Sequence, residues 1–181
     1  MPYKTIIITI IFLGLFNIQY VLAEDVKSTQ AKAQPPKDTP KANKISQVVL
    51  GQGVISCVAR INQVTNYLGY RDNTSAVLMV PSVQQDQQLI SIVMAVPMAD
   101  STAYASADFA PNQSNGCGAT YDGVVYWPDK CEVVSTKQFS AFKKTSPLNK
   151  DVSMLDGGAF MKVFLMKAGT GCVSIKKEVV Q

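Results

Sequence analysis

The spacing of hydrophobic positions changes along this chain and predicts which segments form helices and which form strands. In residues 46–68 apolar side chains recur every three or four positions, which is the period of one helix face. Residues 129–142 are the second predicted helix. Asp129 is its expected N-cap, and Glu132, three residues later, completes a capping-box pattern.

Shorter runs rich in Val, Ile, Leu and Met are typical of β-strands. These runs are residues 76–80, 89–96, 103–109, 120–127, 151–155, 160–167 and 172–179. The runs at 76–80 and 89–96 are almost continuously apolar, which indicates central strands covered on both faces. Because the strands follow one another instead of alternating with helices, the pattern predicts an α+β fold. We expect a mainly antiparallel sheet of about six to seven strands, packed by two helices and stapled by disulfides.

The first 44 residues do not fit this pattern. Residues 1–23 read as a secretory signal peptide: Lys4 is followed by an apolar run, and Ala23 ends a small-residue cleavage site. The strongly apolar part is too short to span a bilayer, so we expect no integral membrane segment in the mature form. Residues 24–44 are rich in Lys and Pro and predict a disordered tether. Residues 45–181 are then a single domain, in a periplasmic or secreted protein.

Composition excludes several functions. The chain contains no His, which excludes Ser-His-Asp and Cys-His nucleophile systems and His-containing zinc sites. The formal net charge of the whole chain is +4, but residues 45–181 hold 11 Lys and Arg against 10 Asp and Glu, a net of +1. A nearly neutral domain without a dense basic patch is not expected to bind nucleic acid. We also expect no metal and no cofactor.

The four cysteines of an exported chain predict two disulfides. We favour Cys117 with Cys131, which flank one strand, and Cys57 with Cys172, which would tie the first helix to the last strand. No two cysteines are spaced as C-x-x-C, so the pattern favours neither a four-thiolate zinc site nor catalytic disulfide exchange.

The candidate binding site is the Gly- and Asn-rich segment 110–118 and the aromatic residues around it. A loop fixed by Cys117 and flanked by aromatic side chains is a common way to contact a protein or a glycan. The alternative is a turn held by a disulfide, with the aromatic residues in the core. The candidate contact residues are Phe109, Asn112, Asn115, Tyr121, Tyr126 and Trp127.

Four functions remain open. The leading hypothesis is a non-enzymatic exported binding module, a soluble accessory or adaptor protein of the bacterial cell envelope that acts by protein–protein contact, with a glycan as the other candidate partner. The second is an inhibitor that presents segment 110–118 to an extracellular or periplasmic hydrolase. The third is a glycan hydrolase that uses two carboxylates from Asp100, Asp108, Asp122 and Asp156. The fourth is a carrier of a small apolar ligand.

Overall fold

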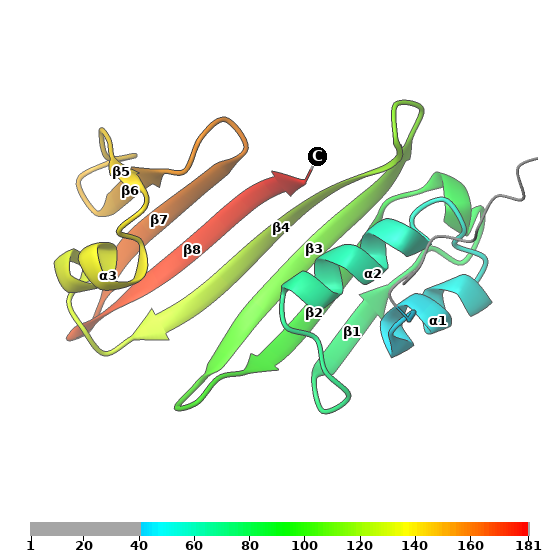
Figure 1. The fold of residues 1–181 in the computed structure, drawn as a ribbon, viewed down its shortest axis with the longest axis horizontal. Helices are drawn as coiled ribbons and strands as arrows, with labels where there is room; N and C mark the ends of the chain where they lie inside the picture. Colours follow the sequence, from blue (N-terminus) through cyan, green and yellow to red (C-terminus); the bar gives the residue numbers. More distant parts are fainter. Residues whose placement is uncertain (1–40, 181) are drawn as a thin grey trace, which may run out of the picture. The chain divides into compact units, whose positions relative to one another are not determined.

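One antiparallel sheet of eight strands runs through the protein (Figure 1). The computed structural model describes residues 41–180, and the strand order is β1-β2-β3-β4-β8-β7-β6-β5. The strands are β1 (Ser75–Met79), β2 (Ile90–Pro97), β3 (Thr102–Asn112), β4 (Gly116–Trp127), β5 (Lys143–Lys144), β6 (Val152–Asp156), β7 (Met161–Ala168) and β8 (Gly171–Val180). The α+β class and the mainly antiparallel sheet are confirmed. The predicted strand number was too low, because β5 is a two-residue edge strand that no hydrophobic run marks.

Within residues 41–180, three helices and one short 3₁₀ turn accompany the sheet, so the predicted two helices were too few. They are α1 (Lys44–Gly51), α2 (Val58–Tyr67), η1 (Gln85–Gln87) and α3 (Cys131–Gln138). The predicted helix at 46–68 is divided because Gly53 has a φ of 91°, a left-handed conformation that ends a helix. Asn43 begins α1 by accepting the Ser46 N–H at 3.0 Å.

A single carboxylate holds the turn between α1 and α2. One oxygen of Asp86, in η1, accepts the backbone N–H groups of Ile55 and Ser56, both at 2.7 Å. Its other oxygen accepts the Ser56 hydroxyl at 2.8 Å. The backbone hydrogen bond from Ser56, followed by that from Ile55, lowers the pKa of Asp86. The ionised carboxylate thus fixes the place where the chain turns into α2.

The third helix is shorter than predicted and begins differently. Lys130 occupies the N-cap position without a side-chain hydrogen bond, so the predicted capping box of Asp129 and Glu132 is wrong. The Asp129 carboxylate instead lies 3.3 Å from the Lys137 ammonium group. Beyond the end of α3, Phe139 and Phe142 pack edge to face with ring centroids 5.7 Å apart. These rings extend the apolar cover that the helix begins.

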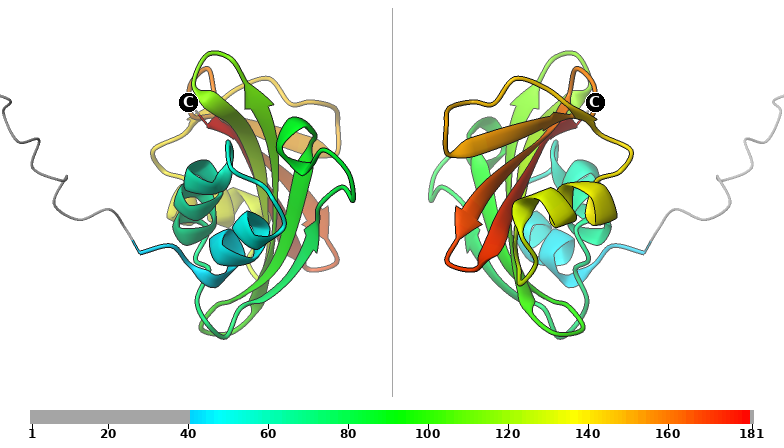
Figure 2. Two further views of the ribbon diagram at one scale, coloured as in Figure 1. Left: turned by 90° about the vertical axis from the view of Figure 1, so that its right-hand side faces the viewer. Right: turned by 90° about the vertical axis from the view of Figure 1, so that its left-hand side faces the viewer.

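All three helices lie on the same face of the sheet, as the two side views in Figure 2 show. α1 and α2 cover a first core on β1 to β4, centred on residues such as Ile61, Ile92 and Phe109. α3 covers a second, smaller core on β6 to β8, which includes Val134 and Val163. We call this side the helix-bearing face and the other side the helix-free face. The runs predicted as central strands, at 76–80 and 89–96, are β1, which is an edge strand, and its neighbour β2, so the central position predicted for the first run was wrong. Within residues 41–180 no helix covers the helix-free face, so neither strand is covered by helices on both faces.

All four cysteines form disulfides, but the predicted pairing was wrong. Cys57 is bonded to Cys117 (S–S 2.07 Å) and Cys131 to Cys172 (S–S 2.02 Å). The reason lies in the strand order. Cys57 immediately precedes α2, which lies over β3 and β4, whereas β8 pairs with β4 and brings Cys172 directly opposite Trp127, near the start of α3. Two disulfides indicate an oxidising compartment, periplasmic or extracellular.

The predicted signal peptide at 1–23 and most of the predicted tether at 24–44 lie outside the described residues. α1 begins at Lys44, one residue before the predicted start of the domain. Among residues 41–180, no helix has the length and apolar character needed to cross a membrane.

Candidate functional site

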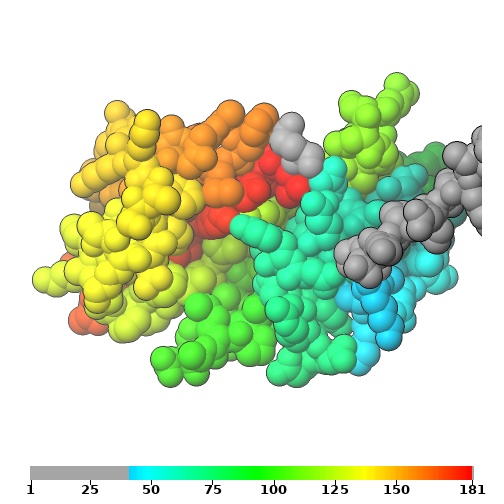
Figure 3. All heavy atoms as spheres, in the orientation of Figure 1, coloured from blue at the N-terminus to red at the C-terminus, as the bar shows by residue number. Residues whose placement is uncertain are grey.

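A hollow separates the two helical groups on the helix-bearing face (Figure 3). We call it the interhelical groove: its walls are α2 and the segment that carries α3, and its floor is β4 and β8. The floor is made of cross-strand pairs that join Gly123 to Lys176 and Val125 to Ser174. A Cβ atom added to Gly123 would have no neighbour within 4 Å. The floor is therefore open above this glycine.

One end of the groove deepens into a pocket of about 250 Å³ beneath Tyr67. We call it the Tyr67 pocket. It is lined by Gln63, Val64 and Tyr67 of α2, Tyr121 of β4, and Glu178 and Val180 of β8. The two tyrosines differ in accessibility: Tyr67 is 63% exposed and Tyr121 only 2%. Their ring centroids lie 5.8 Å apart.

Four side chains form a connected polar and aromatic cluster at this pocket. The Lys176 ammonium donates to the Tyr67 hydroxyl at 2.9 Å and lies 5.1 Å and 5.5 Å from the ring centroids of Tyr67 and Tyr121. The Tyr121 hydroxyl donates to a carboxylate oxygen of Glu178. The same oxygen lies 3.4 Å from Lys176 Nζ. Each charged group therefore has a partner, and both tyrosine rings lie beside a cation.

The cluster shifts the two tyrosines in opposite directions. The hydrogen bond from Lys176, followed by the one shared with Tyr121, lowers the pKa of Tyr67. Burial raises the pKa of Tyr121, and its hydrogen bond to Glu178 acts in the same direction. Tyr121 therefore stays protonated and acts as a fixed donor beneath the groove. The arrangement presents a cation, a carboxylate and an aromatic ring in fixed positions.

The structure disperses the predicted contact residues. Phe109 is fully buried in the first core and reaches no surface. Asn112 and Asn115 lie at the tip of the β3–β4 hairpin, where the side-chain Oδ1 of Asn112 accepts the backbone N–H groups of Ser114 and Asn115, both at 3.0 Å. The predicted loop at 110–118 is mostly strand, because β3 continues to Asn112 and β4 begins at Gly116.

The three remaining aromatic residues lie on two faces. Tyr121 and Trp127 are on the helix-bearing face, at the two ends of the groove floor. Trp127 packs against the second core, and its indole N–H donates to the Ser174 hydroxyl at 2.8 Å. Tyr126 is half-exposed on the helix-free face. The sequence analysis missed Tyr67, Lys176 and Glu178, because no local motif marks them.

The four candidate catalytic carboxylates do not gather in a hollow. Asp108 and Asp122 lie on the helix-free face at diagonal positions of β3 and β4. Asp122 is bound by Lys177 at 2.9 Å. Asp156 lies three strands away from β4 and is bound by Lys162 at 2.8 Å, whose hydrogen bond lowers the pKa of Asp156. Asp100 lies in the turn between β2 and β3. None of the four lines the hollows described here.

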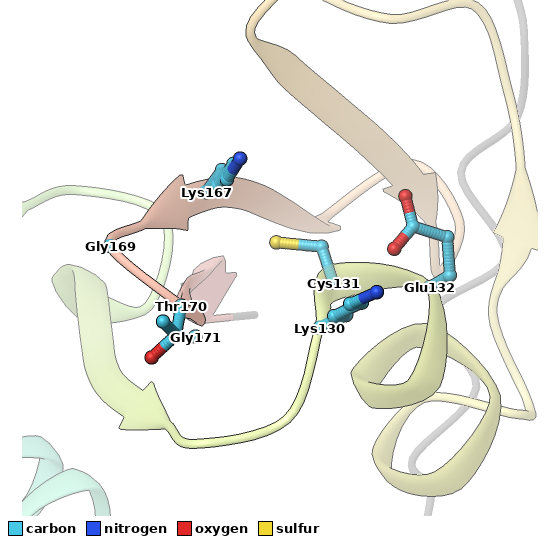
Figure 4. A pocket seen from close by; sticks show the side chains of 7 residues that line it. All are labelled: Lys130, Cys131, Glu132, Lys167, Gly169, Thr170 and Gly171. Carbon is cyan, nitrogen blue, oxygen red and sulfur yellow. The ribbon is translucent and has the colours of Figure 1, made fainter.

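A second hollow, of about 630 Å³, lies at the start of α3 (Figure 4). Lys130 at the N-cap of α3, Glu132 in its first turn and Lys167 from β7 surround it, and the β7–β8 turn closes one side. Neither lysine has a carboxylate within 4.0 Å among residues 41–180. The hollow is open and its lysine side chains are exposed. Among these same residues no group of three or more His, Cys, Asp or Glu is placed to hold a metal ion.

Comparisons of the chain with protein-family models, with curated proteins and with solved structures find no match. A functional assignment for this protein therefore rests on the geometry described above.

Proposed function

We propose that this protein is a non-enzymatic, exported binding module of the bacterial cell envelope, and that it receives a segment of a partner protein in the interhelical groove. The observation that carries the proposal is the groove itself. It lies between two separately packed cores, has an open floor at Gly123, and ends in a pocket whose polar groups are already held in place.

The size of the Tyr67 pocket favours an inserted side chain over a whole small ligand. Pockets for drug-sized ligands have volumes of about 300–1,000 Å³, and this one is about 250 Å³. Interfaces commonly concentrate their binding energy where one anchor side chain fills such a pocket, and tyrosine is enriched there. Tyr67, exposed at the rim, has the position of such a contact residue.

The chemistry of the pocket favours a polypeptide over an apolar ligand. Lys176, on the groove floor beside the pocket, can donate to a carbonyl group, and Glu178, which lines the pocket, can accept from an N–H group. Together they offer both halves of what a peptide bond requires. Because Tyr121 and the ion pair already fix these groups, little side-chain entropy is lost when a partner binds. An apolar ligand would leave the charged groups without new partners.

The proposed location combines two observations. The signal-like sequence at residues 1–23 directs export, and the two disulfides fit an oxidising compartment. Both favour the periplasm or the exterior of the cell as the place where the partner is met.

Site-specific photocrosslinking in producing cells tests this function. The photoreactive residue p-benzoylphenylalanine replaces Tyr67, which is 63% exposed, and in a matched control it replaces Val83, which is 64% exposed in the β1–β2 connection. We expect one discrete crosslinked protein from position 67 and none from position 83. A second chain carries the crosslinker together with Gly123→Leu, whose side chain enters open space and fills the groove floor.

The crosslinked product at position 67 should disappear in the Gly123→Leu chain. If it persists there, or if position 83 gives the same product, the groove is not the contact. A third chain carries the photoreactive residue in place of Asn115, at the tip of the β3–β4 hairpin. A crosslinked product from this chain, and none from position 67, would favour the hydrolase-inhibitor hypothesis instead.

A further inference from the structure

The helix-free face carries two apolar rows that cross the sheet. The first row joins Met154, Phe164, Ile175, Val124 and Tyr104 as directly paired neighbours on five consecutive strands. The second joins Val152, Met166, Val173 and Tyr126 in the same way. Figure 2 shows no helix on this side of the sheet. The result is a broad apolar surface on the outside of the described fold.

This surface is not what a water-facing sheet normally presents. In an antiparallel sheet with one solvent-exposed face, apolar and polar residues alternate along each strand. In β7 the four residues at 163–166 are all apolar, with Val163 and Leu165 buried under α3 and Phe164 and Met166 facing the other way. In β4 the residues at 124–127 are also all apolar or aromatic, with Val124 and Tyr126 on the helix-free face and the residue that follows each of them on the helix-bearing face. These strands have the composition of strands that are covered on both faces.

The charges beside the apolar rows are neutralised within the chain. The neighbouring row contains Asp156, Lys162, Lys177 and Asp122. The Lys162–Asp156 pair is separated by 2.8 Å and the Lys177–Asp122 pair by 2.9 Å. Asp108, which also lies on this face, has no ion pair among residues 41–180. A face whose charges are mostly paired offers little attraction to a strongly charged partner and repels an identical face only weakly.

We infer that a second copy of this chain covers the helix-free face, so that two sheets stack face to face about a twofold axis. A twofold interface places the same patch on both copies, and two apolar sheet faces pack about 10 Å apart. This contact is independent of the interhelical groove, which lies on the opposite face.

The size of the face is adequate for a stable dimer. Six strands, β2 to β4 and β6 to β8, spaced by about 4.8 Å and about six residues long, cover roughly 600 Å² in projection. Because side chains project from the sheet, the accessible area of the face is larger than this projected area and approaches the ~800 Å² that each partner buries in a standard interface. The apolar centre and the paired charges beside it match the usual division into an apolar core and a polar rim.

Sedimentation velocity and light scattering of the purified exported chain, over a concentration series, test this inference. We expect the mass of two copies. Tyr104→Asp places a charge in the first apolar row at a side chain that is 48% exposed, so the monomer tolerates it. Ile175→Asp does the same at the centre of the row. Each should weaken the dimer about 100-fold.

Leu148→Asp is the matched control, because Leu148 is 66% exposed in the segment before β6 and lies outside both rows. It should leave the dimer intact. Circular dichroism reports whether each variant is folded. If the Ile175→Asp chain is unfolded, the Tyr104→Asp chain alone tests the dimer. A wild-type chain that stays monomeric throughout the series overturns the inference, and so does a Tyr104→Asp chain that dimerises as tightly as the wild type.

Discussion

Replacing Cys57 and Cys117 together by Ala removes the disulfide that joins the start of α2 to β4, and the structure sets the size of the effect. The two residues are 60 positions apart. In the chain-entropy model a cross-link of that span removes about 14 cal/mol/K from the unfolded chain, or about 4 kcal/mol at 25 °C. The Cys131–Cys172 bond spans 41 positions, and the same relation gives it about 4 kcal/mol.

Urea unfolding measures this loss, because the chain has a single tryptophan, Trp127, which packs against the second core and reports on it by fluorescence. The free energy of unfolding in water should fall by about 4 kcal/mol for the Cys57→Ala/Cys117→Ala chain. A loss below about 1 kcal/mol would show that the bond does not restrict the unfolded chain as the model requires.

Thiol titration of the same variants tests the pairing directly. The Cys57→Ala/Cys117→Ala chain should contain no free thiol, because Cys131 and Cys172 remain bonded to each other. A crossed control, Cys57→Ala/Cys172→Ala, should contain two free thiols in the denatured chain. The opposite result, two thiols in the first chain and none in the second, would refute the structure's pairing.

Three further substitutions probe single contacts. Asp86→Asn should lower the melting temperature at neutral pH. Because the pKa of Asp86 is lowered in the folded state, its carboxylate stabilises the wild type above the ordinary Asp pKa, and this stability is lost as the pH falls through the folded pKa. The melting temperature of the variant should therefore depend less on acid pH, and an unchanged acid profile would contradict this. Gly171→Ala should lower the free energy of unfolding in urea titrations, because its Cβ would lie 2.3 Å from a backbone oxygen of β4. Gly123→Ala is the matched control and should be neutral, because its Cβ meets open space. Equal effects of the two substitutions would contradict this difference in packing. Tyr121→Phe leaves Glu178 without its hydroxyl donor and should cost about 1.5–3 kcal/mol of unfolding free energy, against no change if that contact is absent.

Most strands could be predicted from the sequence because their signals are local. The seven apolar runs each correspond to a strand, and the Gly-containing turns after Asp156 and Ala168 connect β6 to β7 and β7 to β8. β5 was missed because its two lysines carry no hydrophobic pattern. The break between α1 and α2 has a local signal in the glycines at 51 and 53, but the helical period of apolar residues continues across them.

The disulfide pairing could not be predicted, because it depends on strand order and not on position along the chain. The last strand, β8, enters the sheet between β4 and β7. That insertion brings Cys172 to the end of β4 and leaves Cys117 at the opposite end of the same strand, near α2. No local pattern specifies which earlier strand the last one will join.

In the candidate site, too, local features could be predicted from the sequence and long-range contacts could not. Tyr67 and Lys176 are 109 positions apart, and Tyr121 and Glu178 are 57 apart, so their contacts exist only once the sheet has formed. The separation of Tyr126 from Trp127 was predictable, since adjacent residues of a strand point to opposite faces. Tyr126 and Trp127 therefore cannot belong to one contact surface on a single face of β4.

The claim that the interhelical groove is the binding site is tested most directly by one dissociation constant. It is measured by calorimetry between the purified chain and the partner segment identified by crosslinking, for the wild type and for Gly123→Leu. Because the leucine fills the open floor without disturbing the fold, we expect binding to weaken about 10-fold or more. Equal affinity for the two chains would contradict the proposal.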